Sequence, residues 1–83
     1  MKEERDMTQH DLVLLLTAGV KCEANVGPYE AGGPYFINLC FPESELFAET
    51  LHTTRGKIRF FATLDAVAKF LKSINIPDFM VHM

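Results

Sequence analysis

Apolar and polar positions are most clearly patterned in the last part of the chain, residues 51–83. Two strand-like runs flank a polar turn at residues 53–56, which is typical of a β-hairpin. Apolar residues then recur at helical spacing over residues 64–74, with Thr63 in the N-cap position. Pro77 prevents the helix from continuing. The pattern predicts a hairpin, a helix and a last short strand.

The length of the hairpin loop decides which residues pair. A two-residue loop at residues 55–56 places Thr53 opposite Ile58 and Leu51 opposite Phe60. In that register the apolar side chains gather on one face, because side chains alternate between the two faces of a strand. A wider loop would shift the pairing.

The N-terminal part of the chain has an ambiguous apolar run. Residues 12–16, LVLLL, show no clear period and allow a helix or a buried strand. We favour the helix because Thr8 and Asp11 have the spacing of a capping box and Gly19 can end it. Residues 1–7 are expected to be a mobile polar start.

Three further strands are expected in the middle of the chain. Residues 20–26 can form a short strand, and the Gly- and Pro-rich stretch 27–35, GPYEAGGPY, predicts a connecting loop. Residues 35–41 are apolar on both faces, which favours a central strand. Residues 45–53 form a strand, or a helical turn followed by a strand.

These elements predict one α+β domain over residues 1–83, in the order α-β-β-β-β-α-β. The sheet is expected to be mostly antiparallel, with four or five strands and two helices. A right-handed crossover through the helix would place the last strand, residues 79–82, parallel to the strand at residues 57–61.

Composition limits the cellular setting. The chain is 48% hydrophobic, which excludes a disordered protein. The longest apolar run, residues 12–16, is far too short to span a membrane. The acidic N-terminus does not resemble a signal peptide, so we expect a cytoplasmic protein.

The charge is unevenly distributed. Residues 1–50 carry three basic and nine acidic side chains, a balance of −6, whereas residues 51–83 carry five basic and two acidic ones, a balance of +3. The net charge is −3. A chain with two such poles can present either of them to a partner or to a second copy.

The basic pole supplies the sharpest candidate binding feature. Arg55 lies at the predicted hairpin tip, and alternation puts Lys57 and Arg59 on one outward face of the following strand. Such a patch can contact an acidic protein surface or a nucleic-acid backbone. Tyr29 and Tyr35 in the Gly- and Pro-rich loop are further candidates, because tyrosine is a frequent anchor at protein interfaces.

No pattern indicates catalysis or metal binding. The histidines, His10, His52 and His82, fall in three different predicted elements and have no nucleophile at a recognisable spacing. Cys22 and Cys40 do not form a metal-binding pair, and Cys40 lies in an apolar run typical of a buried, inert thiol. We therefore expect a protein without enzymatic activity, cofactor or metal.

The C-terminal segments TTRGKIRFF (residues 53–61) and TLDAVAKFL (residues 63–71) resemble a known family. They are similar to small partition-associated accessory proteins of the ParC type, encoded on plasmids and integrative elements. Those proteins pair a TxRGxxRxF hairpin with an SLDAVAxFL helix and a final FxV strand. The likeness covers residues 51–83. It implies a non-enzymatic protein of a mobile element that acts through contacts with protein or DNA.

The sequence thus predicts an accessory protein that binds a protein partner and forms a homodimer through its open sheet edges. One alternative is an inhibitor of a host defence complex, which masks nucleic-acid-binding surfaces with acidic side chains. The acidic candidates are Glu23, Glu30, Glu43, Glu45 and Glu49. A second alternative is a small DNA-binding protein that uses the basic hairpin, although the overall acidity makes a nucleic-acid partner less favoured.

Overall fold

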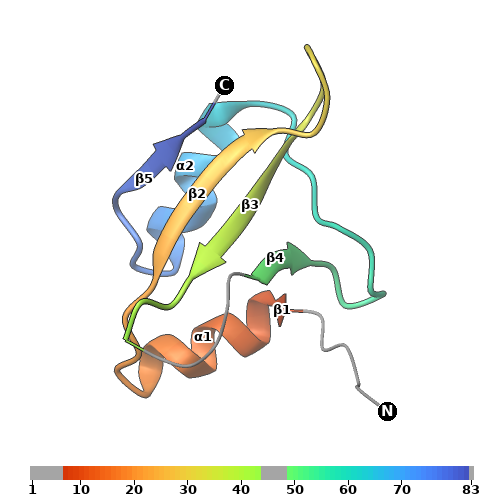
Figure 1. Cartoon of the computed structure of the whole chain (residues 1–83). Coiled ribbons are helices and arrows are strands. Elements are labelled where there is room, and N and C mark those ends of the chain that lie inside the picture. Colours follow the sequence, from red (N-terminus) through yellow and green to blue (C-terminus); the bar gives the residue numbers. More distant parts are fainter. Residues whose placement is uncertain (1–6, 44–48, 83) are drawn as a thin grey trace.

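The computed structural model describes residues 7–43 and 49–82, which form two helices and a five-stranded sheet (Figure 1). The strand order in the sheet is β1-β4-β3-β2-β5. The elements are β1 (Met7–Thr8), α1 (Gln9–Thr17), β2 (Glu23–Pro28), β3 (Tyr35–Cys40), β4 (Glu49–His52), α2 (Leu64–Ser73) and β5 (Phe79–Val81).

The sheet is mixed. β3 lies at its centre, as its sequence predicts, and pairs antiparallel with β2 and β4. The outer strands β1 and β5 run parallel to β4 and β2. The expected mostly antiparallel sheet is therefore correct for the inner pairs only.

The first described residue corrects the expected mobile start. Met7 is buried and pairs with Leu51 as part of β1, which places a strand before the first helix. This strand escaped the sequence analysis because two residues are too few to show a period. Residues 1–6 lie outside the described part of the chain.

Helix α1 begins and ends as predicted. The Thr8 hydroxyl accepts from the Asp11 backbone N–H, and the Asp11 carboxylate accepts from the Thr8 N–H, each at 3.3 Å. This reciprocal pair is a capping box. Gly19 follows the helix at a φ of 90°, a conformation that glycine adopts without a steric cost.

Helix α2 also keeps its predicted bounds. The Thr63 hydroxyl accepts from the Ala66 backbone N–H at 3.1 Å, and Asn75 has the left-handed φ of 66° that ends the helix.

Neither helix of the described chain has the length and apolar character needed to cross a membrane. β5 was expected to run parallel to a strand at residues 57–61, but it is parallel to β2, its hydrogen-bonded neighbour.

The hairpin after β4 has a three-residue loop, and this shifts the predicted register by one residue. Thr53 donates its backbone N–H to Lys57 at 2.7 Å, and Ile58 pairs with His52 instead of Thr53. Gly56 has a φ of 84°, as expected for the last residue of a three-residue hairpin loop. A one-residue shift exchanges the faces of the returning segment.

That returning segment is not a regular strand. Among its described residues, Ile58 pairs with His52 of β4 and Phe61 pairs with Tyr35 of β3, each as an isolated bridge. β4 pairs with β3 only at Glu49 and Thr50. Residues 57–61 therefore lie between β3 and the end of β4, where the two strands separate.

Both helices pack on one face of the sheet. Leu12 of α1 and Leu71 of α2 belong to the same buried cluster as Ile37 and Leu39 of β3. In Figure 1, α2 lies behind β2 and β5. Within residues 7–43 and 49–82, no helix covers the opposite sheet face.

We expect Leu39→Ala to lower the free energy of unfolding by about 2–5 kcal/mol, because it opens a cavity in the centre of the core. Leu39 is 0% exposed. Denaturant unfolding followed by circular dichroism measures the change. Leu14→Ala, at a site 56% exposed on α1, is the control and should change stability by about 0.5 kcal/mol or less. Equal losses in both variants would contradict the proposed core.

Candidate functional site

The sheet face without helices presents a continuous set of side chains, which we call the open face. Directly paired residues share a face, so Asn25 of β2 lies beside Asn38 of β3 and Met80 of β5. The described residues of the open face include Thr8, Glu23, Asn25, Tyr29, Phe36, Asn38, Cys40, Thr50, His52, Ile58, Phe60, Met80 and His82.

An aromatic cluster forms one end of the open face. The Tyr29 ring makes edge-to-face contacts with Phe60 and Phe36, with centroids 5.0 and 6.2 Å apart. Tyr29 and Phe60 remain 56% and 44% exposed. The loop between β2 and β3 holds Tyr29 in place, because its N–H donates to the Pro34 carbonyl at 2.8 Å. The cluster is thus fixed in position and open to solvent.

Short hydrogen bonds connect the polar side chains of the open face. The Thr50 hydroxyl donates to Asn38 Oδ1 at 2.8 Å, and His82 Nε2 lies 2.9 Å from Asn25 Oδ1. An amide oxygen only accepts, so this contact is a hydrogen bond in the tautomer with a proton on His82 Nε2. Asn25 Nδ2 also contacts Cys40 Sγ at 3.8 Å. These polar side chains therefore find hydrogen-bond partners within the open face.

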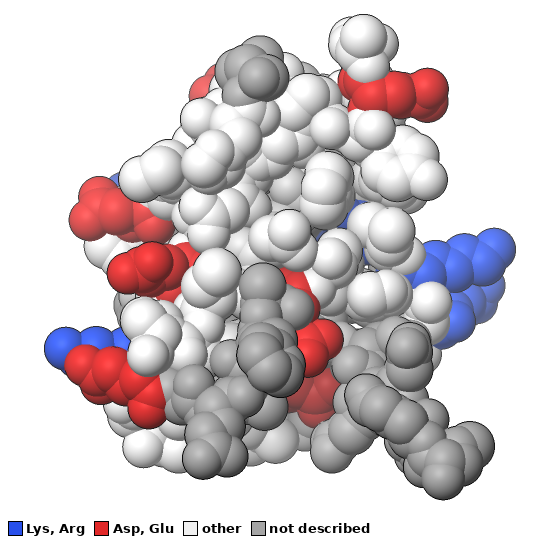
Figure 2. Space-filling model, in the orientation of Figure 1, with Lys and Arg blue, Asp and Glu red and all other residues white. Residues whose placement is uncertain are grey.

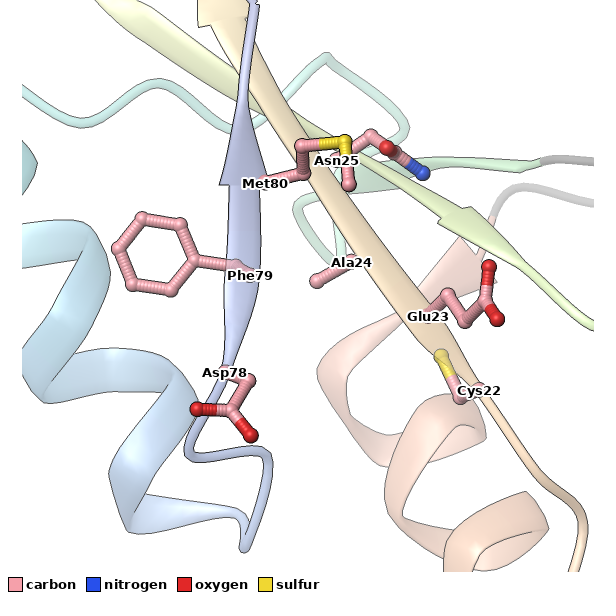
Figure 3. A pocket seen from close by; sticks show the side chains of 7 residues that line it. All are labelled: Cys22, Glu23, Ala24, Asn25, Asp78, Phe79 and Met80. Carbon is pink, nitrogen blue, oxygen red and sulfur yellow. The ribbon is translucent and has the colours of Figure 1, made fainter.

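A shallow hollow of about 380 Å³ lies at the β5 edge of the open face (Figure 3). Its lining residues are Cys22, Glu23, Ala24, Asn25, Asp78, Phe79 and Met80. In Figure 3 the Phe79 ring points toward α2. Met80 is 60% exposed. We call Glu23 and Asp78, the two carboxylates of this hollow, the acidic edge.

The three residues of the predicted basic patch do not lie together: Arg59 packs against the fold, whereas Arg55 and Lys57 are exposed. The Arg59 guanidinium carbon lies 4.6 Å from the Phe70 ring centroid and 5.2 Å from that of Phe61. Its Nη1 also donates to Gln9 Oε1 at 3.2 Å. Arg59 therefore ties the hairpin to both helices. Arg55 and Lys57 remain exposed at the hairpin, and we call them the basic edge.

The other predicted site residues fall at separate places. Tyr35 is half-buried against the core and exchanges two backbone hydrogen bonds of 2.8 Å with Phe61, so it does not join Tyr29. Glu49 pairs with the buried Leu39 and thus faces the helix side. Glu45 lies outside the described residues.

Sequence analysis missed most of the open face. Phe60 was expected to pack with Leu51, but the shifted register brings Arg59 beside Leu51 and turns Phe60 outward. Cys40 was expected to be buried and is only half-buried on the open face. Asn25 in β2 and Asn38 in β3 each alternate with apolar neighbours, and these two positions could have indicated a solvated face.

Cys22 has a strongly perturbed thiol. Burial raises its pKa from 9.0 to about 11, and the negative charges of a Cys40 thiolate and of Glu23 add to the effect. A raised pKa disfavours the nucleophilic thiolate. Within residues 7–43 and 49–82, no three His, Cys, Asp or Glu side chains gather as a metal site.

Comparisons of the chain with protein-family models, curated proteins and solved structures find no match. The candidate site is therefore defined by the residues of the open face.

We expect Arg59→Ala to lower the free energy of unfolding by about 1 kcal/mol, because two ring contacts are lost together with packing of the aliphatic stem. Thermal or denaturant unfolding measures the change. Arg55→Ala removes the same charge from an exposed site and is the control, with an expected loss close to zero. A larger loss for Arg55→Ala would contradict the structural role of Arg59.

We expect the thiol of Cys22 to react slowly with iodoacetamide in a Cys40→Ala variant. Burial, the largest cause of the raised pKa, and Glu23 are both retained in this variant, so the pKa stays above 9.0 and the thiolate fraction near neutral pH stays low. The alkylation rate should keep rising with pH above 9.0. The chain unfolded in urea is the control. A half-maximal rate below pH 9.0 in the folded protein would contradict the raised pKa.

Proposed function

We propose that this chain is a non-enzymatic interaction module that binds a protein partner on its open face. The observation that carries the proposal is the aromatic cluster of Tyr29, Phe36 and Phe60, which is fixed by ring contacts and yet exposed. Aromatic anchors of this kind supply a large share of binding energy at protein interfaces.

The composition of the open face also supports a protein partner. Tyrosine, phenylalanine and methionine are enriched at the centres of interfaces, whereas lysine and glutamate are depleted. The described open face has four such apolar side chains and no Lys or Arg, and Glu23 is its one acidic residue. Burying the open face against a protein partner would therefore remove few charged groups from water.

A nucleic-acid partner has less support. Binding to a phosphate backbone requires several free cations. Arg59 is engaged with Phe61 and Phe70, which leaves Arg55 and Lys57 as the exposed cations of the hairpin. The inhibitor alternative relied on acidic mimicry, and Glu49 faces the helix side instead of joining Glu23. Neither alternative gains a specific observation.

The resemblance of residues 51–83 to partition-associated accessory proteins suggests where such a module works. We propose a role in a plasmid or integrative element, in which the module binds a protein partner instead of performing chemistry. Phe60 occupies a variable position of the TxRGxxRxF motif, between the motif residues Arg59 and Phe61, so it lies in the same hairpin without being part of the motif.

Site-specific photo-crosslinking in cells tests this function. With p-benzoylphenylalanine in place of Phe60, we expect covalent adducts to protein, because the open face holds a partner within reach of this position. The same group in place of Leu14 on α1 is the control and should give few adducts, since Leu14 is more exposed than Phe60, at 56% against 44%, but lies outside the open face. Adducts are detected by gel shift and identified by mass spectrometry.

A second variant separates binding from simple exposure. Adding Tyr29→Ala should reduce crosslinking at position 60 by about tenfold, because alanine at an interface anchor typically costs more than 1 kcal/mol. Unchanged circular dichroism would show that the fold is retained. Absence of protein adducts at position 60, or equal yields at positions 60 and 14, would contradict the proposed function.

A further inference from the structure

Two edges of opposite charge flank the open face. The acidic edge, Glu23 and Asp78, lines the hollow beside β5, whereas the basic edge, Arg55 and Lys57, extends from the hairpin at the far side of the sheet. Figure 2 shows several acidic side chains on the left of this view, with one basic side chain beside them at the lower left, and a group of basic side chains on the right. Further acidic side chains appear near the centre and at the upper right, and the area over β2 and β3 is largely uncharged. Near the acidic edge, Lys21 is paired with Glu43 at 3.5 Å. The open face therefore has negative charge at one edge, positive charge at the opposite edge and little charge between them.

Such a surface is complementary to itself. When two copies meet face to face around a two-fold axis perpendicular to the line between the edges, each basic edge lies over the acidic edge of the other copy. A two-fold contact uses the same patch on both subunits, so this one rotation satisfies both charge pairs at once. The rotation about the other in-plane axis would instead oppose like charges, which is unfavourable.

The centre of the open face suits burial against a second copy. Tyr29, Phe60 and Met80 offer apolar surface that packing would remove from water. The polar side chains between them are already hydrogen-bonded, as Thr50 is to Asn38 and His82 is to Asn25. Burying polar groups that keep their hydrogen bonds carries a reduced cost.

The size of the face sets the expected affinity. The four strands β4, β3, β2 and β5 are neighbours in the sheet. β2 and β3 have six residues each, β4 four and β5 three. At about 3.3 Å per residue and about 4.8 Å between strands, they give a projected area on the order of 300 Å². A standard interface takes about 800 Å² of accessible surface from each partner. We therefore expect a dissociation constant of micromolar order.

We propose that the open faces of two copies of this chain pack together, with Arg55 and Lys57 of one copy against Glu23 and Asp78 of the other. The inference rests on the proposed function of the open face as a protein-binding surface, and it names the occupant. It places the homodimer contact on the sheet face and not on the sheet edges. The apolar centre supplies affinity, and the crossed charges fix the orientation.

Sedimentation velocity of the purified full chain tests the dimer. Over concentrations from about 1 to several hundred micromolar, we expect the mass to rise from 9.4 kDa toward twice that value. Arg55→Glu with Lys57→Glu should weaken the dimer about tenfold or more, and so should Glu23→Lys with Asp78→Lys, because each places like charges together. The decisive sample is the mixture of both variants, in which the crossed charges return and a heterodimer should form.

A matched control removes the effect of net charge. Lys69→Glu with Lys72→Glu makes the same charge change on exposed positions of α2 and should leave dimerisation within about twofold of the unmodified chain. High salt should weaken the dimer, since the edge charges are solvent-exposed. Circular dichroism checks that each variant is folded. Crosslinking of the otherwise unmodified chain to a second copy of itself, through p-benzoylphenylalanine at position 60, provides a readout that needs no charge variant.

The outcomes separate this inference from the proposed function. A monomer throughout the concentration range, with adducts at position 60 only to other proteins, would overturn the self-association and support the broader function. A dimer that dissociates in neither charge variant, or variants that do not form a heterodimer when mixed, would overturn the crossed-charge arrangement. No protein adducts of any kind would overturn both.

Discussion

The register of the hairpin around Gly56 determines most of what this chain presents to its surroundings. Adjacent phenylalanines, Phe60 and Phe61, mean that either register can send one aromatic ring toward the core. The three-residue loop selects Phe61 for burial and leaves Phe60 on the open face. Because a shift by one residue exchanges the two faces of a strand, a single left-handed glycine decides on which face the exposed aromatic cluster forms.

The same register gives Arg59 a structural role. On the helix side of the hairpin, its guanidinium contacts Phe61 and Phe70 and donates to Gln9, so one side chain joins residues from the hairpin and both helical regions. An arginine in this position stabilises the fold, and its guanidinium is not available to contact a partner. The positive charge left for partners then lies at the hairpin tip, at the rim of the open face instead of on its surface.

The features that sequence predicts well are local ones. Both N-caps, the helix ends at Gly19 and Asn75, and the central position of β3 follow from side-chain chemistry within a few residues. The hairpin register, the partner of β5 and the short strand β1 depend on contacts between distant segments, so no local pattern determines them. Residue type alone suggests Tyr29 as a binding residue. That Tyr29 and Tyr35 lie on opposite faces follows only from the pairing register of β2 and β3.

The open face follows from the size of the helices. α1 and α2 have nine and ten residues, and at about 1.5 Å per residue each is only about 15 Å long. Both are needed over one face, where Ile37 and Leu39 are fully buried, so no further helix of the described chain is left to cover the other face. Tyr29, Phe60 and Met80 nevertheless occupy that uncovered face, although polar residues would suit a permanently solvated sheet. A fold that leaves rigid aromatic side chains uncovered while satisfying the polar groups between them has the properties of one half of an interface.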